Sequence, residues 1–145
     1  MRRLPILVLV ALGLSGCGYF NSLYNANRHF SEAQRAEATG DLAVARPAYR
    51  ETIEKAAASY RGHPEGRWSD DALVLIGRSR FALGEPAAAA AAMRHVLDRQ
   101  PGEQHRLTAT AYLGAALVRL DSAEAARPHL DAAIAGLRPG SDIAA

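Results

Sequence analysis

The chain has 145 residues, carries 17 basic and 15 acidic side chains, and contains a single cysteine. This length accommodates one modest domain, the charge balance argues against a nucleic-acid partner, and a lone cysteine excludes an intramolecular disulfide. Aromatic residues make up only 6% of the sequence while alanine is abundant, a composition that favours an all-α fold.

The N-terminal segment has the order of a secretory signal. Arg2 and Arg3 precede an apolar run over about residues 4–14, which is shorter than the roughly 20 residues of a membrane-spanning helix. Residues 14–17 read Leu-Ser-Gly-Cys and resemble the bacterial lipobox, in which the cysteine receives a diacylglyceryl group and becomes the first residue. We therefore predict a removed signal peptide over 1–16, lipidation of Cys17 with fatty acyl chains such as palmitate, and a short tether over 17–21.

A plain signal peptide with a coincidental cysteine is the alternative, but it would leave an unpaired thiol on an exported protein. Acyl chains contribute about 0.8 kcal/mol for each buried CH₂, so two or three of them anchor a protein firmly. The residue after the cysteine is Gly18 rather than aspartate, and the resemblance then implies the periplasmic face of the outer membrane of a Gram-negative bacterium. Cleavage also removes Arg2 and Arg3 (17 − 2 = 15), which leaves 15 basic and 15 acidic residues.

Local sequence signals divide the rest of the chain into helices. Ser69 is predicted to cap a helix whose first turn holds Asp70 and Asp71, and Pro86 is predicted to open another helix. The residues 139–145 are predicted to form a frayed tail. The predicted helices span 22–39, 41–61, 69–83, 86–99, 103–120 and 122–137.

An internal repeat groups these helices in pairs. The clearest unit reads Leu73-x₂-Ile76-Gly77 and continues to Ala89-x₃-Met93, with weaker copies before and after it. This unit resembles the tetratricopeptide repeat, whose uninterrupted period is 34 residues. The small residues Ala33, Gly77 and Gly114 occupy one repeat position at separations of 44 (77 − 33) and 37 (114 − 77) residues. The resemblance predicts a repeat domain over 22–138, built as a short right-handed α-solenoid of about three antiparallel pairs.

Catalytic and metal-binding constellations are missing from the sequence. The five histidines are dispersed without His-x₃-His spacing, and a single cysteine cannot form a thiolate metal site. No nucleophile elbow or specific phosphate-binding loop is present. We therefore expect a non-enzymatic protein without metal, cofactor or small-molecule substrate, whose function lies in a protein-binding surface.

The tetratricopeptide resemblance places a concave groove on the first helices of successive pairs. The corresponding positions are Asn27, Phe30, Gln34, Glu37, Asp71, Val74, Arg78, Phe81, Thr108, Ala111, Ala115, Val118 and Arg119. Seven of these combine rings, aliphatic groups and guanidinium groups that suit an extended apolar peptide and its carboxylate: Phe30, Gln34, Val74, Arg78, Phe81, Val118 and Arg119. The alternatives are that the two phenylalanines only pack between helices and that Arg78 pairs locally, for example with Asp71.

The segment 60–68 is predicted to be a loop or an extension of the flanking helices, because about ten residues are inserted there. It contains Tyr60, Arg67 and Trp68, three residue types that are enriched at interaction hot spots. We treat these three as candidate loop contacts. The alternative, which we favour for Trp68, is that its side chain plugs the joint between the first two units.

A more specific likeness combines the lipobox, the segment Tyr24-Asn25-Ala26 and the run of residues 68–77 that begins Trp-Ser-Asp-Asp-Ala-Leu. Together they are similar to the tetratricopeptide lipoproteins of the outer-membrane β-barrel assembly machinery (BamD-like). This resemblance implies a tethered adaptor that holds unfolded barrel precursors or companion subunits. Those lipoproteins usually have about five repeats and this chain has three, so a general cell-envelope scaffold for division, peptidoglycan or export complexes is the alternative function. The third unit lacks a polar capping helix, which predicts an apolar edge at Ala125, Ala132 and Ile134.

Overall fold

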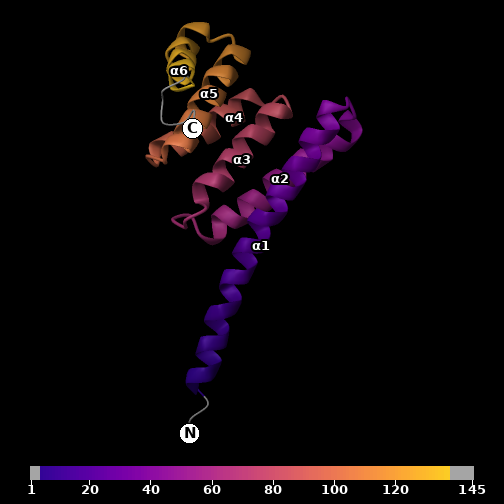
Figure 1. The fold of residues 1–145 in the computed structure, drawn as a ribbon, viewed down its shortest axis with the longest axis vertical. Helices are drawn as coiled ribbons and strands as arrows, with labels where there is room; N and C mark the ends of the chain where they lie inside the picture. Colours follow the sequence, from indigo (N-terminus) through magenta and orange to yellow (C-terminus); the bar gives the residue numbers. More distant parts are fainter. Residues whose placement is uncertain (1–3, 138–145) are drawn as a thin grey trace.

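The computed structural model describes the backbone of residues 4–137 and the side chains of residues 21–137. This part of the chain contains six helices and no strand, which confirms the all-α prediction (Figure 1). With the exception of the start of the first helix, every helix end lies within one residue of its predicted position. The helices are α1 (Leu4–Ala38), α2 (Leu42–Gly62), α3 (Ser69–Ala82), α4 (Pro86–Asp98), α5 (Glu103–Arg119) and α6 (Ala123–Gly136).

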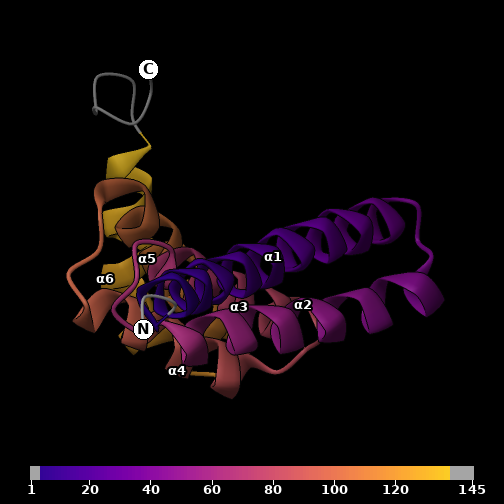
Figure 2. The same cartoon turned by 90° about the horizontal axis from the view of Figure 1, so that it is seen from below.

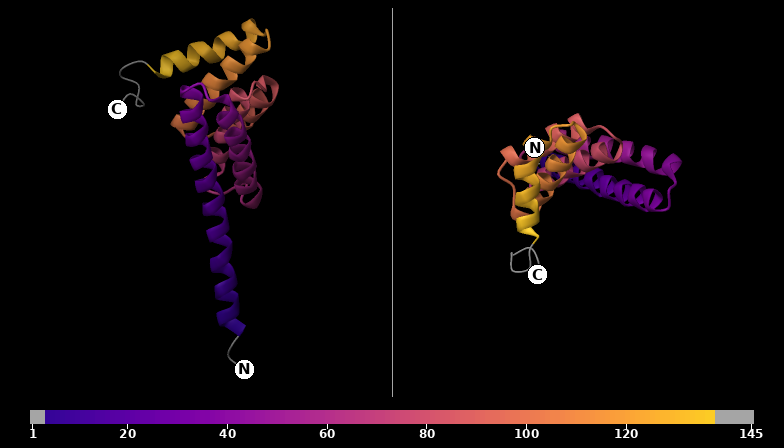
Figure 3. Two further views of the ribbon diagram at one scale, coloured as in Figure 1. Left: turned by 90° about the vertical axis from the view of Figure 1, so that its right-hand side faces the viewer. Right: turned by 90° about the horizontal axis from the view of Figure 1, so that it is seen from above.

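The first helix is longer than predicted, because it begins at Leu4 instead of residue 22. Its N-terminal half projects beyond the other helices (Figures 1 and 3). The apolar run 4–14 is rich in leucine, and no proline follows Pro5 before residue 22. The helix therefore continues through the segment 17–21, which we predicted to be a separate tether.

Cys17 lies within α1 but outside the described side chains, and the tail 139–145 lies outside the described residues altogether. Over the described residues, no helix has the length and apolarity required to span a membrane.

The helices stack as three successive antiparallel pairs. Each helix packs against the next one in the chain, and α1 also contacts α3 while α3 contacts α5. Within the described residues, the backbones of α2, α4 and α6 are not neighbours, although the Tyr60 side chain of α2 reaches His95 of α4. The first helices of the three pairs therefore lie side by side, as in a small helical-repeat solenoid (Figures 1 and 2). The right-handed sense of the solenoid stays a prediction.

The turns within the three pairs share one backbone geometry. Gly40, Gly84 and Asp121 all have positive φ angles, of 78°, 79° and 55°. Each of these residues donates its N–H to the carbonyl three residues earlier, and the next residue donates to the carbonyl five residues before it, which is the double bond of a Schellman C-cap. Their separations of 44 (84 − 40) and 37 (121 − 84) residues equal those of the predicted repeat. The turn geometry thus supports the repeat alignment independently of the side chains.

Small residues allow close approach within each pair. Ala33 is fully buried in the first pair. An added Cβ would lie 2.6 Å from Met93 Cε at Gly77 and 2.8 Å from Leu130 Cδ2 at Gly114. The crowding side chains, Met93 and Leu130, lie on the second helix of each pair, one helical turn after the buried residues Ala89 and Ala126.

The start of α3 differs from the predicted cap. Trp68 is the N-cap residue and Ser69 is the first helical residue. The Ser69 hydroxyl donates a hydrogen bond to the Gly66 carbonyl at 2.7 Å and accepts one from Arg99 Nη2 at 2.7 Å. Its side chain is thus engaged by the preceding loop and by the end of α4, and it is not available to cap α3.

Candidate functional site

A chain of three cavities runs along α1, α3 and α5. The first cavity and the second both include Asn27 and Asp71 in their linings. The second and the third share Arg78. Neighbouring cavities share side chains and follow one another along these helices, and we refer to the three together as the α1–α3–α5 groove. It lies on the three helices predicted to line the concave face.

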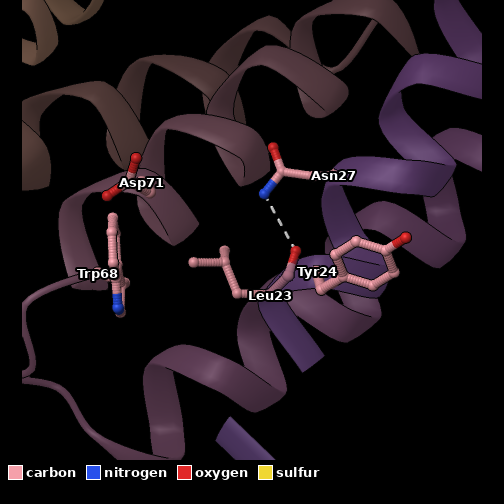
Figure 4. A pocket seen from close by; sticks show the side chains of 5 residues that line it. All are labelled: Leu23, Tyr24, Asn27, Trp68 and Asp71. Atoms are coloured by element: carbon pink, nitrogen blue, oxygen red, sulfur yellow. Dashed lines mark hydrogen bonds between the residues drawn. The ribbon is translucent and has the colours of Figure 1, made fainter. Parts of the chain in front are cut away.

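The first cavity is the apolar end of the groove and has a volume of about 350 Å³. Leu23 and Tyr24 contribute to it from α1, and Trp68 and Asp71 from the start of α3. Leu23 points toward Trp68, and Asn27 donates a hydrogen bond to the Leu23 carbonyl at 3.1 Å (Figure 4). This end therefore offers an indole and aliphatic surface with one carboxylate at its edge.

The middle cavity, of about 200 Å³, contains a polar pair between helices. His105 Nε2 on α5 lies 3.2 Å from Asp71 Oδ1 on α3. Val74 lines the same cavity but is 7% exposed. Asp71 is thus occupied by His105, and the predicted local pairing between Asp71 and Arg78 is not formed.

The third cavity, also of about 200 Å³, is the cationic end of the groove. The Arg78 guanidinium lies 4.5 Å from the ring centroid of Phe30 and 5.6 Å from that of Tyr112. Its Nε is buried and has no hydrogen-bond partner in the described part of the protein. The ring contacts hold the cation by cation–π attraction while leaving its N–H groups without an acceptor.

Arg119 supplies a second guanidinium to the same cavity. It lies 3.7 Å from the ring centroid of Phe81, and its Nη1 donates to the Phe81 carbonyl at 2.8 Å. Neither Arg78 nor Arg119 has a carboxylate within 4.0 Å among residues 21–137. Two positive charges therefore face this end of the groove without an anionic partner.

The one acidic residue that lines the cationic end among the described side chains is already bonded. Glu37 accepts a hydrogen bond of 2.5 Å from the hydroxyl of Tyr49. Burial of this hydroxyl, followed by its bond to Glu37 and the charge of that carboxylate, raises the pKa of Tyr49 above its ordinary value. The contact orients Glu37 toward α2 and stabilises the protonated phenol.

The structure brings five of the seven predicted groove residues into one cavity. Phe30, Gln34, Arg78, Phe81 and Arg119 line the cationic end together. The other two lie elsewhere, since Val74 is buried beside the middle cavity and Val118 is 48% exposed and lines none of the three cavities as described. Sequence reasoning missed eight lining residues of the three cavities. The missed residues are Leu23, Tyr24, Tyr49, Leu75, Ala82, Gln104, His105 and Tyr112.

The spacing of residues along α5 would have identified one of the missed residues. Tyr112 lies four residues after Thr108, one of the predicted groove positions, so both project from the same face of α5. Tyr49 sits at the repeat position of Met93 and Leu130, which suggested only packing. Gln104 and His105 carry no signal that separates them from surface residues of the first helical turn.

The predicted loop contacts are used within the domain. Tyr60 lies in α2 and its hydroxyl is 2.8 Å from His95 Nε2. Trp68 packs against the core between the first pair and α3, as expected for a plug, while one side of it lines the apolar cavity. The exposed Arg67 lies over the Trp68 ring at 4.5 Å. These contacts organise the joint between the first two pairs.

Comparison with known proteins adds no assignment, because no family model, curated protein or solved structure matches the chain. The residues with described side chains also contain no cluster of three or more His, Cys, Asp or Glu suited to a metal ion. The candidate site is therefore defined by its own geometry, a groove with an apolar end and a cationic end.

Proposed function

We propose that this protein is a lipid-anchored periplasmic adaptor that binds other proteins through the α1–α3–α5 groove. The observation that carries the proposal is the row of three neighbouring cavities on the first helices of three stacked pairs, with an apolar and a cationic end. Helical-repeat proteins use such extended concave surfaces to bind partners. The lipobox-like segment ending at Cys17 supports the anchor, because it precedes this domain directly in the sequence.

For the process served, we propose outer-membrane β-barrel protein assembly, on the resemblance of the lipobox and the repeat motif to BamD-like lipoproteins. Such an adaptor holds unfolded barrel precursors or assembly subunits at the periplasmic face of the outer membrane. Depletion of the protein is then expected to lower the amount of folded barrel proteins in the outer membrane. Unchanged barrel levels after complete depletion would remove this role.

The groove itself is tested by photocrosslinking in living cells. A photoreactive residue at Gln34, which is exposed and lines the cationic end, is expected to crosslink to barrel precursors or assembly subunits. The matched control is the same residue at Glu54, which is 66% exposed on α2 and outside the groove linings. Equal products from both positions would contradict binding in the groove.

A general cell-envelope scaffold is the second candidate. The three helix pairs favour it, because BamD-like lipoproteins usually have about five repeats and dock other subunits through the later ones. Crosslinked proteins from division, peptidoglycan or export complexes, without any barrel assembly component, would select this function over the first one.

The anchor has its own test. Replacement Cys17→Ala is expected to abolish labelling by radioactive palmitate and to leave the protein unprocessed or soluble, because the acylated sulfur is removed. Persistent labelling of this variant would refute lipidation at Cys17, whatever the partner of the groove is.

A further inference from the structure

The charges along the α1–α3–α5 groove point to the chemistry of its occupant. We infer that the groove binds an extended internal segment of a partner protein, about six residues long, with an acidic side chain at the Arg78–Arg119 end and an apolar side chain at the Leu23–Trp68 end. This inference rests on the proposed adaptor function and specifies what the adaptor recognises.

The acidic side chain follows from charge complementarity. Arg78 and Arg119 lie in one cavity and have no carboxylate within 4.0 Å among residues 21–137. Among residues 21–137, Glu37 is the only carboxylate that lines that cavity, and it is bonded to Tyr49. A carboxylate from a ligand, together with Glu37, would balance the two guanidinium charges of this cavity.

An acidic side chain is preferred over the C-terminal carboxylate of a partner. Terminal carboxylates are captured by nests of free backbone N–H groups, whereas clusters of arginine recognise acidic motifs. The residues that line the cationic end lie within α1, α2, α3 and α5, where the backbone N–H groups are committed to the helices. Only side chains are therefore offered to the ligand at this end.

The length of the segment follows from the helix that runs along the groove. Leu23 lines the apolar end and Glu37 lines the cationic end, and these residues are 14 positions apart in α1 (37 − 23). A rise of 1.5 Å per residue gives about 21 Å. An extended chain covers about 3.3–3.6 Å per residue, so about six residues reach from one end to the other.

The experiment uses the processed lipoprotein in detergent and an array of random six-residue peptides attached through their N-termini. One set of peptides has amidated C-termini and a second set has free ones. We expect binding to the amidated set to depend on an aspartate or glutamate near one end and a large apolar residue near the other. Replacement of the acid by its amide is expected to weaken binding about tenfold, as loss of a charge-assisted bond does.

Variants connect this preference to the groove. Arg119→Gln changes an exposed residue and is expected to lower affinity for the acidic peptides about tenfold while leaving the amide peptides unchanged. The control Arg106→Gln alters another α5 arginine, whose bonds within residues 21–137 all go to Glu103 of the same helix, and is expected to have no effect. Arg78→Lys keeps the positive charge beside Phe30 but removes the guanidinium fork. A loss of affinity for the acidic peptides in this variant would show that the fork is required for binding.

Three results would overturn the inference: binding that ignores the acidic residue, a preference for basic peptides, or binding that requires only a free C-terminus. These outcomes are distinguishable from failure of the proposed function. If crosslinking at Gln34 recovers partners while the array shows no acidic preference, only this inference fails. If acidic peptides bind while depletion leaves barrel levels unchanged, the groove chemistry stands and the barrel-assembly role fails.

Discussion

The first and last helix pairs share a turn geometry but differ in how they are held. In the α1–α2 pair, Phe30 and Tyr49 pack edge to face with ring centroids 5.8 Å apart, and both are buried. In the α5–α6 pair, α6 contacts only α5 among the described elements and buries only Ala126 and Ala133. Both pairs are terminal, so each has only one neighbouring pair, and the one that buries fewer side chains is expected to be the less stable part of the array. The groove is therefore anchored most firmly on its α1 side.

The largest expected effect comes from the aromatic core of the first pair. Phe30→Ala removes a buried ring that packs on Tyr49 and carries the Arg78 guanidinium, so we expect a loss of about 3 kcal/mol in the free energy of unfolding. Ile134→Ala in α6 removes a side chain that is 58% exposed and is expected to change stability by less than about 0.5 kcal/mol. Urea unfolding followed by circular dichroism measures both, and comparable losses would abolish the contrast between the pairs.

A smaller difference is expected between the two buried glycines. Gly77→Val would drive a side chain into Met93, which is fully buried, and is expected to cost about 2 kcal/mol. Gly114→Val meets Leu130, which is only partly buried and can move aside, so about 1 kcal/mol is expected. Thermal unfolding of the two variants under the same conditions gives the order, and a larger loss at Gly114 would show that the last pair is the more tightly packed one.

The two glycines also show how far sequence reasoning reached. The repeat pattern places a small residue where the two helices of a pair approach each other, which locates Gly77 and Gly114. It also places a residue that tolerates a positive φ angle at the turn of each pair, which locates Gly40, Gly84 and Asp121. Apart from the start of α1, the helix ends and five groove residues were predictable from the same repeat pattern. The Ser69 cap was wrong because Arg99, 30 residues later in the chain, binds the serine hydroxyl. Likewise, the pairing of Asp71 with His105 depends on how α3 and α5 pack, which no local pattern contains.

The next prediction compares an arginine whose bonds join two helices with an arginine whose bonds stay within one helix. Arg99 at the end of α4 donates to Asp70 at 2.7 Å and to Ser69 at 2.7 Å, and its side chain is 18% exposed. Arg99→Gln is expected to destabilise the protein by about 1.5 kcal/mol, because Asp70 and Ser69 lose a charged donor. The control Arg106→Gln, in the last pair, removes an exposed pair within α5 and is expected to leave the urea midpoint unchanged. An equal shift of the midpoint in both variants would contradict a special role for Arg99.

The smallest effect is a pH dependence confined to the first pair. The pKa of Tyr49 is raised in the folded protein by burial and by Glu37, whereas an unfolded tyrosine titrates near pH 10. Above about pH 10 the unfolded chain therefore releases a proton that the folded protein retains, so the stabilisation present at lower pH is lost with a slope of up to about 1.4 kcal/mol per pH unit. Tyr49→Phe removes this contribution, costs about 1 kcal/mol at neutral pH through the lost hydrogen bond, and is expected to flatten the fall in stability between pH 10 and 11.

Tyr24→Phe is the matched control for this titration, because Tyr24 is 62% exposed and its substitution leaves the contact between Tyr49 and Glu37 intact. All other residues are the same in the two variants, so the difference between the urea midpoints of the variants at each pH compares Tyr49 with Tyr24 directly. If Tyr49→Phe and Tyr24→Phe lose stability in parallel above pH 10, the phenol is not held in its protonated form by the first pair. In that case the hydrogen bond does not hold Glu37 toward α2, and this carboxylate can turn to pair with Arg78 or Arg119 in place of a ligand.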